Sequence, residues 1–173
     1  MTLLVGGVEL GGTKCVLAVA KSPIDILHRT VIPTENPKKT LQNIFDFFSD
    51  YELNRIGIGT FGPVILDSES KDYGLLITES KKGWKNINLS REFSNNLHVD
   101  TIIDTDVNAA AIGEYNYGVG KDLQTIVYVT IGTGIGGGLL VNGKSHTGDF
   151  HLELGHMRIP NADNCAGICK FHG

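Results

Sequence analysis

The stretch YVTIGTGIGGGLL, residues 128–140, decides how this chain folds. It opens on an apolar run rich in β-branched residues, which predicts a strand. Glycine occupies five of the seven positions from 132 to 138, strand character resumes at Leu139, and Asn142-Gly143 favours a hairpin turn. So few side chains let backbone N–H groups approach an anion, usually a phosphate, although plain turn chemistry is the alternative.

The same glycines also fit the G-x-G-x-x-G pattern of dinucleotide-binding folds, through Gly132, Gly134 and Gly137. That pattern requires a helix to open directly after the glycines, with its N-terminus facing the pyrophosphate. Here a strand and an Asn-Gly turn follow instead, so the context argues against a Rossmann fold.

A second strand–glycine turn–strand unit lies at the start of the chain. Residues 3–8 predict a strand, residues 9–14 (ELGGTK) a glycine turn, and residues 15–20 a returning strand. Two such hairpins, each with a threonine in its turn, predict a nucleotide held from both sides across a cleft. The elements expected between them are strands at 26–32, 55–59 and 98–103, helices at 38–49 and 91–97, and a polar loop at 78–88 that Trp84 anchors to the core.

Composition indicates a cytosolic α/β protein. The chain has 173 residues, is 41% hydrophobic, and carries a net charge of −4 without a lysine-arginine cluster, so no nucleic-acid or membrane partner is expected. No apolar run reaches the length of a transmembrane helix, and the start lacks the features of a secretory signal. Three cysteines, an odd number, argue against a disulfide framework.

Residues 104–114 (DTDVNAAAIGE) predict a strand that ends at a carboxylate, followed at once by an alanine-rich helix. An acid at this place can simply cap the helix. The functional alternative is a general base at the carboxyl edge of a sheet, where open α/β folds bind ligands. The helix N-terminus would then hold that carboxylate ionised.

The end of the chain contains a possible metal-binding cluster. Cys169 and His172 have the spacing of metal ligands, and His156 and Cys165 are upstream candidates to join them, although one Cys-x-x-His pair is weak evidence by itself. Residues 118–122 form a glycine-containing bend. The sequence therefore predicts an N-terminal α/β domain over 1–118 and the opening of a second domain over 119–173.

Taken together and in this order, these stretches resemble the ROK family of sugar kinases, most closely its bacterial fructokinase branch, over residues 5–173. The turns at 9–14 and 132–138 resemble the two phosphate motifs of the family, and Gly62-Pro63-Val64 and Gly83-Trp84 stand at its usual places between them. Residues 104–114 resemble the catalytic motif, with Asp106 at the position of the base. Residues 152–156 resemble the segment whose glutamate holds sugar hydroxyls and whose histidine begins a zinc site.

This resemblance implies the actin-like, ribonuclease-H-like fold, in which two related α/β domains surround a cleft and of which the second is incomplete here. It implies a hexose and MgATP as substrates, with Asp106 taking the proton from the sugar hydroxyl. The phosphate-binding residues that it implies are Gly11, Gly12, Thr13, Lys14, Gly132, Thr133 and Gly134. The sugar-binding residues that it implies are Gly62, Pro63, Thr105, Asp106, Glu153 and His156. The zinc ligands that it implies are His156, Cys169 and His172, with the fourth beyond the chain end and Cys165 as a less favoured substitute.

Three departures from the family pattern bear on these expectations. Many members have Asp where Glu9 stands, which affects how Mg²⁺ is positioned. Glucose-type members have a sugar-binding Asn where Thr105 stands, so Thr105 favours fructose or mannose. The usual zinc loop contains Cys-x-Cys, whereas this chain has Cys169-x-x-His172.

The expected activity is therefore phosphorylation of D-fructose to fructose 6-phosphate by a cytoplasmic enzyme that is a homodimer when full length. The alternatives are a mannose, glucose or N-acyl-hexosamine kinase and a non-catalytic sugar- or nucleotide-binding fragment. A sugar-responsive repressor is disfavoured because the chain opens on the phosphate hairpin and retains Asp106. Family members continue well beyond residue 173, so we expect this chain alone to be inactive or barely active.

Overall fold

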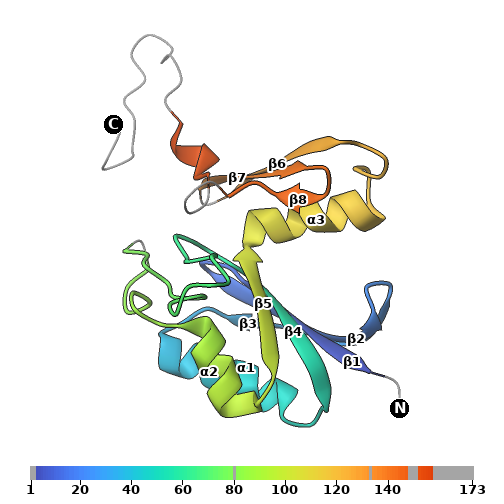
Figure 1. Ribbon diagram of the computed structural model, residues 1–173. Helices are drawn as coiled ribbons and strands as arrows, with labels where there is room; N and C mark the ends of the chain where they lie inside the picture. Colours follow the sequence, from blue (N-terminus) through green and yellow to red (C-terminus); the bar gives the residue numbers. More distant parts are fainter. Residues whose placement is uncertain (1–2, 80, 133, 148–151, 158–173) are drawn as a thin grey trace.

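The computed structural model describes residues 3–79, 81–132, 134–147 and 152–157 and contains two sheets with a helix between them (Figure 1). The five-stranded sheet has the order β3-β2-β1-β4-β5, and the three-stranded sheet has the order β6-β7-β8. The elements along the chain are β1 (Leu4–Leu10), β2 (Lys14–Ser22), β3 (Asp25–Pro33), α1 (Pro37–Phe48), β4 (Leu53–Thr60), α2 (Leu89–Leu97), β5 (Asp100–Thr105), α3 (Asp106–Tyr117), β6 (Thr125–Ile131), β7 (Ile135–Val141), β8 (Lys144–Ser145) and the 3₁₀ helix η1 (Leu154–His156).

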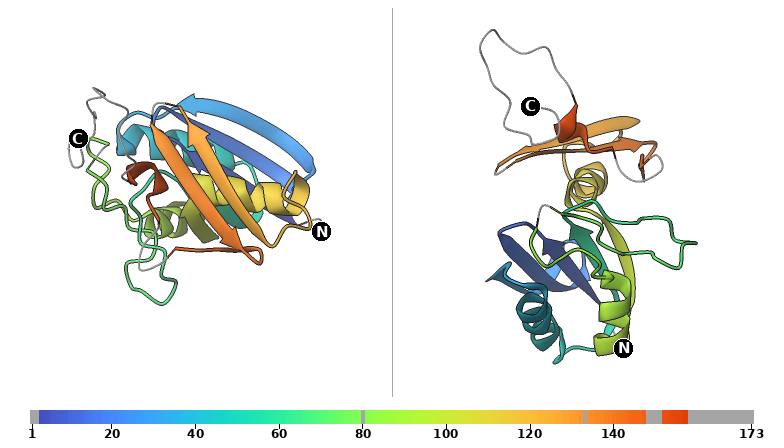
Figure 2. Two further views of the ribbon diagram at one scale, coloured as in Figure 1. Left: turned by 90° about the horizontal axis from the view of Figure 1, so that it is seen from above. Right: turned by 90° about the vertical axis from the view of Figure 1, so that its left-hand side faces the viewer.

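The large sheet combines a meander with two crossovers. β1, β2 and β3 pair antiparallel through tight turns, whereas β1, β4 and β5 run parallel and are joined through α1 and α2. Both of these helices lie on one face of the sheet, as Figures 1 and 2 show. The apolar side chains of this face and of the two helices form the buried core. The parallel strands β4 and β5 therefore place their carboxyl ends at the same edge as the end of β1.

The first two helices begin one and two residues before their predicted starts, α1 at Pro37 and α2 at Leu89. Asn36 caps α1 by accepting a hydrogen bond from the Lys39 N–H (3.1 Å), and Pro37 occupies the first turn, where its missing N–H costs nothing. Asn88 caps α2 by accepting from the Arg91 N–H (2.9 Å). Trp84 is fully buried, and its indole Nε1 donates to the Glu35 carbonyl oxygen at 3.0 Å. The expected role of Trp84 as an anchor is confirmed.

α3 lies between the two sheets, with the small sheet packed on its far side from the large one (Figures 1 and 2). It contacts β4 and β5 as well as β6 and β7, so it holds the two sheets together. Gly118 ends α3, which places the predicted domain boundary at the end of this helix. That boundary stays a prediction.

The glycine-rich stretch differs from its expected form. A turn was expected over 132–138, but β7 begins at Ile135 and includes the last three glycines. A Cβ on Gly138 would lie 2.7 Å from the Val107 carbonyl oxygen, and one on Gly137 would lie 2.8 Å from Leu154 Cβ. These glycines therefore let β7 approach α3 and η1 closely. The Asn142-Gly143 turn is confirmed, with φ of 51° and 75°.

Within the described part of the chain, no helix combines the length and the apolar character that crossing a membrane requires.

Candidate active site

A cleft of about 610 Å³ lies between the large sheet and the elements α3 and β6. Its wall is largely apolar, and carboxylates of Glu9, Asp104 and Asp106 also line it. Glu9 comes from the end of β1, Asp104 from the end of β5, and Asp106 from the start of α3. The parallel topology thus brings these three acids to one edge of the sheet, as expected for an open α/β fold.

Asp106 is the first residue of α3, but it does not cap that helix. Thr105 is the cap, since its buried side-chain hydroxyl accepts from the Asn108 N–H at 3.2 Å. Asp106 Oδ1 accepts from the N–H of the next residue, Val107, at 2.9 Å. The capping role that competed with catalysis in the sequence is therefore filled by the neighbouring residue, and Asp106 lines the cleft.

The environment of Asp106 raises its pKa above the ordinary aspartate value. Burial is the largest cause, and the negative charges of Glu9 and Glu153 add to it. The backbone N–H groups of Val107 and of Asp106 itself oppose the rise but do not cancel it. The N–H groups at the helix N-terminus do lower the pKa, as expected, but burial outweighs them, and the ionised state of Asp106 stays a prediction. A carboxylate with a raised pKa is the better proton acceptor once it is ionised.

Asp104 ties the two sheets together, a role that the sequence did not reveal. Its Oδ1 accepts from the Thr105 N–H and from Asn108 Nδ2, both at 2.7 Å. Its Oδ2 accepts from the Ser145 hydroxyl of β8 at 2.8 Å. Ser145 is distant in sequence and carries no motif, so only the folded chain shows this contact.

The first glycine turn lies at the end of β1, beside Glu9. The Gly11 N–H donates to the Lys14 carbonyl oxygen at 3.1 Å and is therefore occupied within the turn. Phe61, next to the predicted sugar-binding pair Gly62 and Pro63, donates its N–H to the Leu10 carbonyl oxygen at 3.0 Å. The predicted phosphate turn and the predicted sugar bend are thus neighbours.

The second glycine turn is only partly described. The Gly132 N–H donates to the Gly134 carbonyl oxygen at 2.8 Å, so this N–H is also used within its own turn. A Cβ at Gly132 or Gly134 would meet no other atom within 4 Å, so the turn has open space around it. Thr133, a predicted phosphate-binding residue, lies outside the described residues.

One further predicted sugar-binding residue, Glu153, acts on Asp106, and another, His156, lies beside Glu153. The charge of Glu153 acts on the Asp106 carboxyl, and His156 Nε2 is 3.9 Å from Glu153 Oε2. The predicted zinc ligands Cys169 and His172, and Cys165, lie outside the described residues. Among the residues that the structure does describe, no three His, Cys, Asp or Glu side chains gather as a metal site would require.

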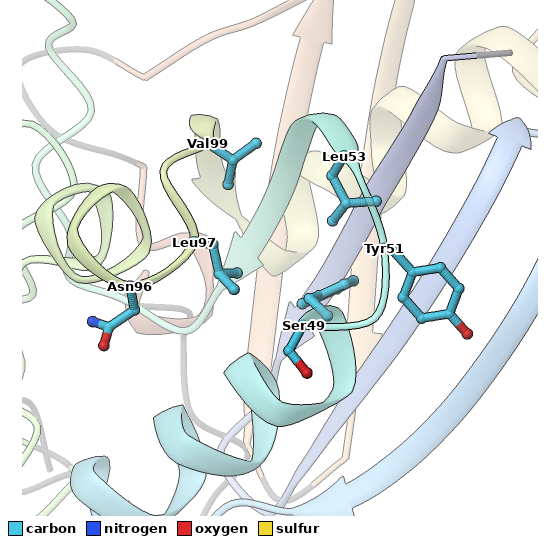
Figure 3. Close-up of a pocket in the computed structure, with 7 residues that line it drawn as sticks. Ser49, Tyr51, Leu53, Asn96, Leu97 and Val99 are labelled. Carbon is cyan, nitrogen blue, oxygen red and sulfur yellow. The ribbon is translucent and has the colours of Figure 1, made fainter. Parts of the chain in front are cut away.

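A smaller hollow of about 230 Å³ lies at the opposite edge of the large sheet, between the ends of α1 and α2 (Figure 3). Its lining includes Tyr51, Leu53, Asn96 and Val99, and none of the predicted site residues is among its lining residues. It is therefore separate from the carboxylate cleft.

The family model and two of the most similar curated proteins indicate the same family of proteins. The ROK family model matches residues 5–173. A putative fructokinase from Bacillus subtilis (strain 168) is 40% identical over 98% of this chain and 58% of that protein. A fructokinase from Lactococcus lactis subsp. cremoris is 41% identical over 100% of this chain and 60% of that protein.

A solved structure with a similar fold also comes from the ROK family. The crystal structure of a ROK family glucokinase from Streptomyces griseus, in complex with glucose and AMPPNP, has a TM-score of 0.78 at 26% identity. That match covers 91% of this chain and 51% of the glucokinase chain. The chain thus spans about half of this structure and about 60% of the length of the two fructokinases.

Proposed function

Since the chain belongs to the ROK family, we propose that the protein phosphorylates a hexose with MgATP and that D-fructose, converted to fructose 6-phosphate, is the preferred substrate. The chain has the mixed α/β, actin-like fold of solved ROK sugar kinases and spans about half of such chains. The proposal of fructose rests on the two fructokinases at 40% and 41% identity. Thr105, at a position where glucose-type members carry Asn, supports fructose or mannose over glucose.

The observation that carries this proposal is the position of Asp106. Its carboxylate lines the cleft at the carboxyl edge of the large sheet, with Glu9 beside it and a pKa raised by burial. In the proposed step Asp106 accepts the proton of the sugar hydroxyl while that oxygen forms a bond to the γ-phosphorus of ATP. The bond from this phosphorus to the β–γ bridging oxygen breaks, and ADP leaves.

The remaining residues position the substrates. Gly12, Thr13, Lys14 and Gly134 are the candidates for phosphate binding, because the N–H groups of Gly11 and Gly132 are occupied within their turns. Mg²⁺ supplies charge neutralisation when bound, and the cleft carboxylate of Glu9 is a hard oxygen ligand of the kind that Mg²⁺ prefers. Gly62, Pro63, Asp106, Glu153 and His156 are the proposed sugar-binding residues. Thr105, which was predicted to be among them, is buried and uses its hydroxyl to cap α3.

The test is ADP release from MgATP with fructose, mannose, glucose or N-acetylmannosamine, using the natural polypeptide in which this sequence occurs. We expect turnover led by fructose, and a loss of at least about 100-fold in kcat for Asp106→Asn, because a general base contributes roughly 10²–10⁴-fold. Asp50→Asn, an exposed carboxylate beyond α1, is the matched control and should retain full activity. Turnover that survives Asp106→Asn would remove Asp106 from the mechanism, and turnover led by glucose would replace fructose as the substrate.

We further propose a structural zinc ion held by His156, Cys169 and His172, and a homodimer as the assembled state. Imidazole and thiolate are ligands suited to zinc, which supports the choice of metal. The zinc content of the purified protein should fall for His156→Ala and stay at one ion per chain for the control His28→Ala. Equal zinc content in both variants would contradict the assignment, and light scattering would test the dimer.

A further inference from the structure

The carbonyl oxygens of the three central residues of the first glycine turn, Gly11 to Thr13, all accept hydrogen bonds from Thr34 or Lys81. The Thr34 hydroxyl donates to the Gly11 oxygen at 2.8 Å, and the Thr34 N–H donates to the Thr13 oxygen at 2.9 Å. Between them, Lys81 Nζ donates to the Gly12 oxygen. Lys81 Nζ also lies 3.3 Å from the carbonyl oxygen of Thr34, the residue that follows β3. Its ammonium group therefore bridges the glycine turn and the end of β3.

This arrangement determines where the N–H groups of the turn point. In a planar trans peptide, the C=O of one residue and the N–H of the next point in opposite directions. Because Thr34 and Lys81 bind the Gly11 and Gly12 oxygens, the Gly12 and Thr13 N–H groups point away from Thr34 and Lys81. Successive N–H groups exposed in this way form a concavity that binds anions.

The loop that carries Lys81 is itself firmly anchored. Trp84, three residues further on, is fully buried, donates to the Glu35 carbonyl oxygen at 3.0 Å and packs edge-on against Phe61 with ring centroids 5.5 Å apart. Phe61 directly precedes the Gly62-Pro63 bend. One loop thus contacts both the phosphate turn, through Lys81, and the residue next to the sugar bend, through Trp84.

We propose that Lys81 is a positioning residue for the nucleotide phosphates: by holding the Gly12 carbonyl oxygen, it presents the Thr13 N–H to a phosphate oxygen. This inference rests on the proposed function, because it names how the same site binds its polyphosphate ligand. Lys81 acts through the backbone of the turn and does not itself contact the ligand. Its charge also makes the hydrogen bond stronger than one from a neutral donor.

The experiment measures MgADP affinity by calorimetry, without sugar, for the wild type and for Lys81→Met, Lys81→Arg and Lys82→Met in the natural full-length polypeptide. Lys82 is the adjacent, exposed lysine and is the matched control. We expect Lys81→Met to bind MgADP about tenfold more weakly, the scale of one charge-assisted hydrogen bond. Lys81→Arg should restore most of the affinity, and Lys82→Met should match the wild type.

Steady-state kinetics separate positioning from a merely structural role. In Lys81→Met the KM for MgATP should rise by a similar factor, while the KM for the sugar stays unchanged. If Lys81 only fastened the loop, the thermal midpoint would fall while nucleotide affinity stayed the same, and the proposal would be overturned.

The two proposals fail in distinguishable ways. If the wild type binds MgADP but phosphorylates no hexose, the proposed function fails. The role of Lys81 is then still decided by comparing the MgADP affinities of the wild type and Lys81→Met. Absence of MgADP binding by the wild type would overturn the role of Lys81, because the turn would then hold no phosphate to position.

Discussion

Three consecutive residues at the junction of β5 and α3 have three different tasks. Asp104 accepts hydrogen bonds from both sheets, Thr105 caps the helix, and Asp106 lines the cleft. The sequence indicated an acid that either caps or catalyses. The choice between these roles depends on which side chain turns toward the Asn108 N–H, and local sequence does not determine that.

The raised pKa of Asp106 predicts a pH-dependent cost to stability. At pH values well below the ordinary aspartate pKa of about 3.9, this carboxyl is neutral in the folded and in the unfolded chain. As the pH rises, the unfolded chain ionises first, because burial and the charges of Glu9 and Glu153 raise the pKa of the folded state. The free energy of unfolding therefore falls as the pH rises from the ordinary pKa to the raised one. Above the raised pKa it stays at this lower value.

Asp106→Asn, which removes this charge, should be more stable than the wild type at pH 7 and closely similar to it below pH 4. Its amide oxygen can still accept from the Val107 N–H. Urea unfolding at several pH values measures the difference, with Asp50→Asn as the control that should show none. A difference that does not grow with pH would contradict the buried-charge explanation. Gained stability together with lost turnover is the pattern expected of a catalytic group.

At the scale of elements, β7 is positioned by glycines whose partners are remote in sequence. A strand–turn–strand unit was predicted here and is present, as is the Asn142-Gly143 turn. The assignment of all the glycines to the turn was wrong, because Gly136, Gly137 and Gly138 meet Val107 and Leu154, which lie in other elements. Sequence pattern reveals where side chains are missing, but only the fold reveals which neighbour needs the space.

Gly138→Ala should therefore destabilise the protein. Its Cβ would lie 2.7 Å from the Val107 carbonyl oxygen, which belongs to helix backbone and cannot yield easily. Overpacking of this kind costs about 1–3 kcal/mol. Gly113→Ala, in α3 with no atom within 4 Å of the new Cβ, is the matched control and should stabilise the helix by up to about 1 kcal/mol. Equal urea midpoints for the two variants would contradict close packing of β7 on α3.

At the scale of the whole molecule, the two sheets differ in how well they are covered. The large sheet has α1 and α2 packed on one face, with a continuous core. In the small sheet, β6 and the start of β7 expose large apolar side chains, among them Val127 at 57%, Ile131 at 80% and Ile135 at 58%. β8 has only two residues, so this sheet is close to a two-stranded ribbon, which is marginally stable alone.

We therefore expect limited proteolysis of the 173-residue chain to begin in the connection between α3 and β6. Lys121 lies in this connection and offers trypsin a cleavage site. Mass spectrometry should detect a resistant fragment that contains β1–α2, while the small sheet is degraded and the chain alone shows little turnover. Recovery of residues 125–147 intact would show instead that the small sheet is stable through its packing on α3.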